Sequence, residues 1–292
     1  MNKYIDNLNQ TSFADLKTKL ERWERLVTEG ASVDILVEEV NDITTNCPFQ
    51  CLKRNTGHFY RARKNEGRNF FNNIEDVWYP REEFVKEVGR ANRSGESKMY
   101  ISQLPRTTLF EMQLKKGDNV TISKIGIKAD SELNVQFISS AEKNSKVVKD
   151  EILFNMGLNE NGVKNYHTIH KFLSDEFTKP DKKWYPLSTA ITETITSYEE
   201  SDGLLYPSMQ SKNDLNIVLK KESADGKLEL ISSVCFEVIA ENLNGSLTIK
   251  DIAATSLIDK ETGELLWNDS LRVDKVWNES ERFGMSKINV GS

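Results

Sequence analysis

The chain has 292 residues, of which 39 are Lys or Arg and 45 are Asp or Glu, so its formal net charge is −6. This length allows a substantial core, and the negative balance argues against a dedicated nucleic-acid-binding protein, which usually carries a basic surface. Three cysteines are too few for a disulfide framework, and no apolar run is long enough for a signal peptide or a membrane helix. We therefore expect a soluble, cytoplasmic protein.

Two amphipathic helices are predicted at the N-terminus. Apolar residues recur at spacings of three and four from Phe13 to Val27, behind the capping residue Ser12, and Gly30 is expected to end this helix. A second apolar series, from Val33 to Ile43, predicts another helix. Residues 1–50 are therefore expected to form a helical hairpin.

The rest of the chain mixes helices with short strands, which predicts an α+β fold. Helices are expected over 80–89, from Pro105 through Glu111, over 165–177 and over 186–198. Strands are expected over 98–102, near 120–122 and 133–137, and over 215–219, 228–239 and 247–249, with a hairpin turn at Thr262-Gly263. We predict a main domain of residues 51–240 and a C-terminal β extension of residues 241–292, packed on the same domain.

A basic segment stands out in this acidic chain. Between residues 53 and 68 there is a single acid, Glu66, and six basic residues: Lys53, Arg54, Arg61, Arg63, Lys64 and Arg68. Such a segment indicates a small anionic ligand, and a solvated surface loop is the alternative interpretation.

Common catalytic and nucleotide-binding motifs are absent: GxGxxG, GxxxxGK[ST], HExxH and GxSxG do not occur. Cys47 with Cys51, and His167 with His170, are pairs that fall short of the ligand set of a zinc site, so we expect no metal. Any dinucleotide would have to be held by side chains in a fold other than the Rossmann fold.

Three blocks of sequence, residues 59–63, 89–111 and 202–208, carry residue types that suit a dinucleotide. Arginine forks bind phosphates through paired hydrogen bonds, an aromatic ring covers a flat base, and a carboxylate stabilises positive charge that develops on a ribose. The candidates are Arg61 or Arg63, Arg90, Asn92, Tyr60 or Tyr100, Glu111 and Ser208. Taken singly, each also fits an ordinary surface, core or turn position, and only their joint pattern favours a site.

The same blocks resemble the RES-domain family, named for an arginine, a glutamate and a serine. The similarity extends from about His58 to about Glu237. It is carried by Phe59-Tyr60-Arg61, Gly89-Arg90-Ala91-Asn92 with Gly95, Lys98 to Glu111, Phe172 to Thr178, Asp202-Gly203 through Tyr206-Pro207-Ser208, and Asn216. The resemblance implies a fold similar to that of ADP-ribosyltransferase toxins, with a split, mixed sheet around an NAD cleft.

The activity implied by this resemblance is degradation of NAD at the nicotinamide–ribose bond, by phosphorolysis or hydrolysis, in a toxin or defence effector. The resemblance makes Arg61, Tyr100, Glu111 and Ser208 catalytic. It adds Tyr60, Arg90 and Asn92 as NAD contacts. NAD is the substrate, inorganic phosphate is the co-substrate of phosphorolysis, and an antitoxin or a second copy of the chain is the expected partner. Alternatives are a protein ADP-ribosyltransferase, and a non-catalytic protein that binds NAD or a partner.

Overall fold

The computed structural model describes residues 3–45, 47–67, 69–138, 149–209, 214–241, 247–259, 261–268 and 289–290. Arg68 of the basic segment lies outside the described residues, as do residues 242–246, 260, 269–288 and 291–292 of the expected C-terminal extension. The described chain combines helices with strands that pair in both parallel and antiparallel directions, which confirms the α+β class.

The chain divides into two compact units, and neither is continuous in sequence. The first unit comprises Met1–Lys53, Arg81–Lys98 and Asn134–Met209. The second unit comprises Arg54–Pro80, Met99–Leu133 and Gln210–Ser292. The expected helical hairpin belongs to the first unit, whereas Arg61, Arg63 and Lys64 of the basic segment belong to the second.

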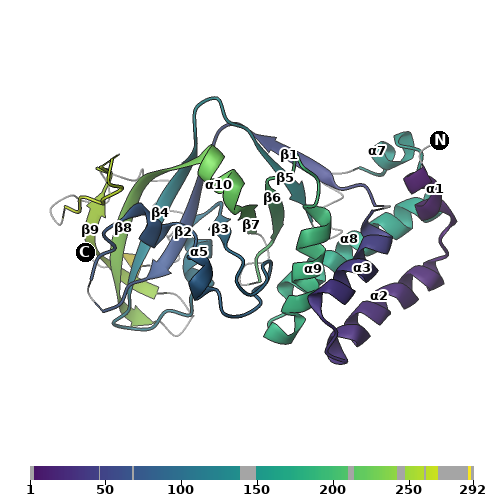
Figure 1. The fold of residues 1–292 in the computed structure, drawn as a ribbon, viewed down its shortest axis with the longest axis horizontal. Coiled ribbons are helices and arrows are strands. Elements are labelled where there is room, and N and C mark those ends of the chain that lie inside the picture. The colour runs from purple at the N-terminus through teal and green to yellow at the C-terminus, as the bar shows by residue number, and fades with distance from the viewer. Residues whose placement is uncertain are drawn as a thin grey trace. The chain divides into compact units, whose positions relative to one another are not determined.

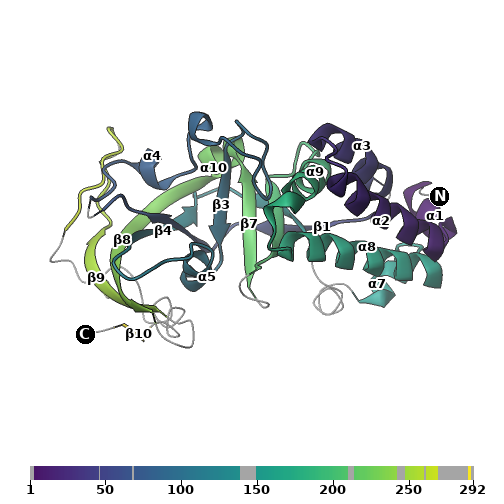
Figure 2. The same ribbon diagram turned by 90° about the horizontal axis from the view of Figure 1, so that it is seen from below.

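Helices dominate the first unit. They are α1 (Lys3–Gln10), α2 (Phe13–Thr28), α3 (Val33–Thr44), α7 (Asp150–Asn155), α8 (Glu160–Thr178), α9 (Tyr185–Ile195) and the 3-10 turns η1 (Glu82–Phe84) and η2 (Lys182–Trp184). Both views show α2, α3, α8 and α9 gathered in one bundle (Figures 1 and 2). Three strands complete the unit in the order β1-β5-β6: β1 (Gln50–Arg54), β5 (Leu133–Phe137) and β6 (Gly203–Pro207).

The two helices predicted at the N-terminus are present as α2 and α3. The Ser12 side chain caps α2 by accepting a hydrogen bond from the Asp15 N–H, and Gly30 follows the helix with φ of 79°, a conformation that favours glycine. Leu20 and Trp23 of α2 are buried, as the apolar spacing predicts. The sequence patterns did not predict α1, which precedes the hairpin.

The helix expected over residues 80–89 does not form, and only the turn η1 (Glu82–Phe84) is present. The Val85 carbonyl accepts hydrogen bonds from the Gly95 N–H at 2.7 Å and from the Ser94 hydroxyl at 3.4 Å. A returning loop therefore uses a backbone acceptor that a continuing helix would need for its own hydrogen bonds.

Strands dominate the second unit. They are β2 (His58–Lys64), β3 (Lys98–Ser102), β4 (Asn119–Ile127), β7 (Leu215–Lys220), β8 (Leu228–Glu241), β9 (Leu247–Thr255) and β10 (Asn289–Val290). Their order is β7-β3-β2-β4-β8-β9-β10, and Figure 2 shows β4, β8 and β9 as curved neighbours. The unit also contains the helices α4 (Ile74–Val77), α5 (Pro105–Phe110) and α10 (Lys221–Lys227).

The core of the second unit determines which face of β2 is polar. Tyr60 is 4 % exposed and packs in a cluster with Leu109 of α5, Ile122 of β4 and Val234 of β8. Side chains alternate along a strand, so Arg61 and Arg63 project from the face opposite this cluster. The apolar cluster therefore leaves one face of β2 for basic side chains.

The remaining short elements agree with the sequence patterns only in part. The helix that begins at Pro105 is confirmed but ends at Phe110, so Glu111 follows the helix instead of lying within it. The expected turn near Thr262 is present, closed by a hydrogen bond of 2.8 Å from the Gly263 N–H to the Asp259 carbonyl. Helix α10 was not predicted. Among the described residues, no helix has the length and apolar character that a bilayer span requires.

Candidate functional site

Two arginines extend from the same face of β2. Arg61 donates from Nε to the Trp78 carbonyl at 2.8 Å and from Nη1 to the Tyr100 carbonyl at 3.0 Å. Arg63 donates from Nη1 to the Asp76 carbonyl, and its guanidinium lies 5.2 Å from the ring centroid of Phe71. Both arginines are half-buried, and backbone carbonyls are the acceptors that hold them.

Within the described part of the chain, neither Arg61 nor Arg63 forms an ion pair. The pKa of Arg61 is lowered to about 10, mainly by desolvation and in smaller part by the charge of Arg63, and Tyr100 opposes the change. Desolvation also lowers the pKa of Arg63, and Asp76 opposes it. Two neighbouring cations without a bound acid form a favourable position for an anion.

The two candidate tyrosines lie in different surroundings. Tyr100 is half-buried in β3, and its carbonyl is bound by Arg61. Tyr60 is 4 % exposed in the apolar core, opposite Ser102 of β3 in the antiparallel pair. The core position explains Tyr60 as a packing residue, so the structure favours Tyr100 of the two for contact with a ligand.

Glu111 is held by a short series of hydrogen bonds. The Ser102 hydroxyl donates to Asn216 Oδ1 at 2.5 Å, and Asn216 Nδ2 donates to Glu111 Oε1 at 2.9 Å. Ser102 and Asn216 are buried, whereas Glu111 is exposed at the end of α5. Because a hydroxyl donor faces the amide oxygen, the amide nitrogen must face the carboxylate. The arrangement presents one oriented, solvent-accessible carboxylate.

Arg90 lies in the first unit, at the C-terminal end of α8. Its Nη1 donates to the carbonyl oxygens of Phe177 at 2.5 Å and Lys179 at 3.2 Å, and its guanidinium lies 4.8 Å from the ring centroid of Tyr185. Carbonyls at the end of a helix lack partners within the helix, and a cation there is favourable. These contacts give Arg90 a structural role within the first unit.

Asn92 shapes the loop between Arg90 and β3. It is buried, its Nδ2 donates to the Arg93 carbonyl at 2.8 Å, and its carbonyl accepts from the Gly89 N–H at 2.9 Å. A Cβ at Gly89 would overlap Asn92 Oδ1, so the turn requires glycine there. The amide of Asn92 therefore maintains the loop from within.

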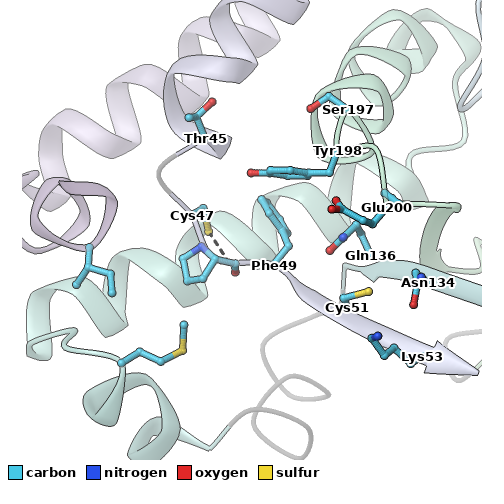
Figure 3. A pocket seen from close by; sticks show the side chains of 14 residues that line it. Thr45, Cys47, Phe49, Cys51, Lys53, Asn134, Gln136, Ser197, Tyr198 and Glu200 are labelled. Carbon is cyan, nitrogen blue, oxygen red and sulfur yellow. Dashed lines mark hydrogen bonds between the residues drawn. The ribbon is translucent and has the colours of Figure 1, made fainter. Parts of the chain in front are cut away.

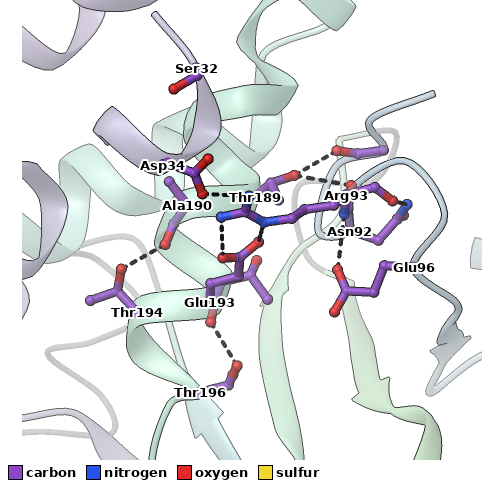
Figure 4. Close-up of polar contacts among 12 residues, drawn as sticks. Ser32, Asp34, Asn92, Arg93, Glu96, Thr189, Ala190, Glu193, Thr194 and Thr196 are labelled. Atoms are coloured by element: carbon purple, nitrogen blue, oxygen red, sulfur yellow. Dashed lines mark hydrogen bonds and ion pairs between the residues drawn. The ribbon is translucent and has the colours of Figure 1, made fainter. Parts of the chain in front are cut away.

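Arg93 fixes the same loop to two helices, as Figure 4 shows. Its Nε and Nη2 donate to the two oxygens of Glu193 in α9 at 2.6 and 2.9 Å, and its Nη1 donates to Asp34 in α3 at 2.6 Å. Hydrogen bonds to both carboxylates raise the pKa of Arg93. The sequence alone does not indicate this role of Arg93, because an arginine in a loop carries no signal of its distant partners.

Ser208 follows β6 directly and is 1 % exposed. The next residue, Met209, has its Sδ 3.6 Å from Arg90 Nη2, so the structure brings this segment to Arg90 within the first unit. The predicted residues thus form two groups. Arg61, Tyr100 and Glu111 belong to the second unit, and Arg90, Asn92 and Ser208 to the first.

The histidine pair and the cysteine pair lie in different surroundings. His167 Nε2 lies 2.7 Å from Asp150 Oδ1, whereas His170 Nε2 lies 3.4 Å from the Pro48 carbonyl oxygen. Cys47 is buried and Cys51 is exposed, and burial raises the pKa of the Cys47 thiol. In the described ranges, no three residues among His, Cys, Asp and Glu are arranged to hold a metal ion.

Two residues of the Glu111 arrangement had no role assigned from the sequence. In the sequence, Asn216 is only one of the positions that match RES proteins, and Ser102 is only the last residue of a predicted strand. Their spacing of more than a hundred residues carries no local pattern. Only the pairing of strands β3 and β7 brings them together.

No protein-family model, no curated protein and no solved structure matches this chain. The resemblance to RES proteins therefore rests on the sequence blocks described above. The geometry of each unit is the remaining basis for a functional argument.

Proposed function

We propose that this chain cleaves the bond between nicotinamide and ribose in NAD, by phosphorolysis or hydrolysis, as an enzyme of the RES type. The observation that carries the proposal is the pair Arg61 and Arg63, which share one face of β2 and form no ion pair among the described residues. A pyrophosphate is a doubly charged anion that guanidinium groups bind with paired hydrogen bonds. We assign the pyrophosphate contact to this pair.

Glu111 supplies the second part of the proposal. Loss of nicotinamide leaves positive charge on the ribose, as in glycoside cleavage through an oxocarbenium-like transition state. A carboxylate fixed beside the ribose stabilises that charge without having to reorganise. The hydrogen bond from Asn216 to Glu111 keeps one carboxylate oxygen in place, which suits this role.

Four other residues complete the proposed NAD site. Tyr100, whose carbonyl accepts a hydrogen bond from Arg61, is proposed to contact the ribose or a flat ring of NAD. Arg90, Asn92 and Ser208 enter through the RES resemblance alone. An ADP-ribosyltransferase-like fold is proposed on the same resemblance, together with the mixed pairing of the strands.

The test measures nicotinamide released from NAD, with and without inorganic phosphate. We expect release by the wild-type protein, and a loss of about 100-fold in Glu111→Ala, a typical effect of removing one preorganised electrostatic group. Glu229→Ala, which removes an exposed acid from β8 in the same unit, is the matched control and should retain activity. Equal activity of Glu111→Ala and wild type would reject this site.

The same reaction mixtures distinguish the alternatives. With NAD labelled in the adenosine part, label in ADP-ribose 1''-phosphate indicates phosphorolysis, and label in ADP-ribose indicates hydrolysis. Label attached to protein indicates an ADP-ribosyltransferase. Saturable NAD binding without any product would identify a non-catalytic binding protein. Growth arrest on expression, relieved by Glu111→Ala, would support action as a toxin held inactive by an antitoxin.

A further inference from the structure

A separate pocket of about 820 Å³ lies entirely within the first unit. Pockets that hold small ligands typically measure roughly 300–1,000 Å³ and combine apolar walls with a few polar groups. Figure 3 shows residues of β1, β5, the segment before β1 and the turn after α9 around this space. None of the residues assigned to NAD lines it.

One wall of the pocket is the Pro48-Phe49 segment before β1. The ring of His170 in α8 supports this wall from behind, with its centroid 5.1 Å from that of Phe49 and its Nε2 3.4 Å from the Pro48 carbonyl oxygen. Burial lowers the pKa of His170 to about 4, so its ring is neutral at physiological pH. The Phe49 ring therefore lines the pocket while packed against an uncharged His170 ring.

A second part of the wall is a tight turn that follows α9. The Ser201 N–H donates to the Tyr198 carbonyl at 3.1 Å, which places Tyr198 and Glu200 in one short turn. This turn is joined to β5, because the Asp202 N–H donates to the Asn134 carbonyl at 2.8 Å. Tyr198 is 53 % exposed, so its ring is accessible to a ligand in the pocket.

Two polar side chains, Gln136 and Glu200, line the pocket together with these rings. Gln136 extends from β5, and Figure 3 shows it among the side chains around the pocket, as it does Glu200 and Phe49. Within the described part of the chain, the side chains of Glu200 and Gln136 form no hydrogen bond or ion pair. A carboxylate accepts hydrogen bonds through two oxygens, whereas an amide can both donate and accept.

We propose that this pocket binds a flat heterocyclic base that presents two adjacent N–H groups, as guanine does. The rings of Phe49 and Tyr198 provide stacking surfaces for the base. The two oxygens of Glu200 accept from the N1–H and the exocyclic amine of guanine, and the Gln136 amide donates to its carbonyl oxygen. Adenine fits less well, because its N1 is an acceptor that would face the carboxylate.

The experiment is calorimetric titration of the full chain with three uncharged nucleosides. Guanosine offers both N–H groups, inosine lacks the exocyclic amine, and adenosine presents an acceptor at N1. We expect affinity to fall in that order. Uncharged nucleosides avoid the phosphate contacts proposed for the arginines, so failure here is distinguishable from failure of the NAD proposal.

Paired variants identify the pocket. Tyr198→Ala and Glu200→Gln should each weaken guanosine binding about tenfold, since a stacked base and a charge-assisted hydrogen bond each contribute on that order. Phe84→Ala and Glu199→Gln remove an exposed aromatic ring and an exposed acid that do not line the pocket, and should leave binding unchanged. Absence of saturable guanosine binding, binding unaffected in both pocket variants, or adenosine binding as tight as guanosine binding would overturn the proposal.

Discussion

Replacing His170 by glutamine should make the protein lose stability as the pH rises from 4.5 to 6.5. In the wild type, the contributions of His170 and Glu176 to the free energy of unfolding should nearly cancel over this range. Two buried side chains of α8 cause this difference. Burial lowers the pKa of His170 from 6.5 to about 4, with a smaller lowering from His167 and an opposing hydrogen bond to Pro48. Burial raises the pKa of Glu176 from 4.5 to about 7, although Lys179 pairs with it; Glu24 and Asp175 add to the rise.

The signs of the two contributions are opposite. Between pH 4.5 and 6.5 the folded protein holds a proton on Glu176 and none on His170, and the unfolded chain does the reverse. The stability due to Glu176 is fully present below pH 4.5 and is lost as the pH rises toward 7. The stability due to His170 is present above pH 6.5 and is lost as the pH falls toward 4. Their proton counts therefore cancel in the wild type.

Each group alone changes the free energy of unfolding by about 1.4 kcal/mol per pH unit, or on the order of 3 kcal/mol across this window. His170→Gln leaves the Glu176 contribution alone, so the stability of this variant should fall with rising pH. Glu176→Gln leaves the His170 contribution alone, so its stability should rise. The double variant should again follow the wild type.

Urea unfolding at pH 4.5, 5.5 and 6.5, followed by tryptophan fluorescence, measures these slopes. The slope is informative even if a substitution also lowers stability by a constant amount. Other titrating groups contribute equally to all four proteins and cancel in the comparison. Single variants whose free energies of unfolding run parallel to the wild type would refute the assigned proton positions.

Three further predictions concern polar contacts. Asn216→Ala should lower NAD turnover about tenfold with little change in KM, because Glu111 loses its orienting donor. Nicotinamide release measures both quantities, and a change in KM alone would contradict this prediction. Arg61→Lys keeps the charge but loses the planar fork, so NAD affinity measured by calorimetry should fall at least tenfold, and near-normal affinity would remove Arg61 from the site. Arg93→Lys should destabilise the protein by about 1 kcal/mol in urea unfolding, with no further loss on adding Glu193→Gln. Additive losses would show that the pair is not coupled.

Local patterns in the sequence predicted those elements whose stability is local. The capped helix behind Ser12 and the strand that begins at Lys98 both appear where apolar spacing and capping residues place them. The helix predicted over residues 80–89 does not form, because the Val85 carbonyl is bound by a loop that returns at Gly95, a contact that no helical periodicity records. Boundaries shifted for similar reasons, as at Glu111, which lies just beyond α5.

The candidate site was predictable only in its residue types. The sequence identified Arg61 and Glu111, but it could not show that Arg63 shares the face of Arg61, since β2 was not predicted as a strand. It gave no sign that Arg90 would bind the last carbonyls of α8 or that Tyr60 would be buried in a core. Such contacts join residues far apart in the chain, and their energies depend on packing that local patterns do not contain.

The interleaving of the two units has a consequence for how this protein is made. The chain passes from one unit to the other after residues 53, 80, 98, 133 and 209. During synthesis the N-terminal hairpin leaves the ribosome long before α8 and α9, the helices against which it packs. Neither unit can be finished until translation has passed Met209. For the same reason, no single proteolytic cut could release one unit intact.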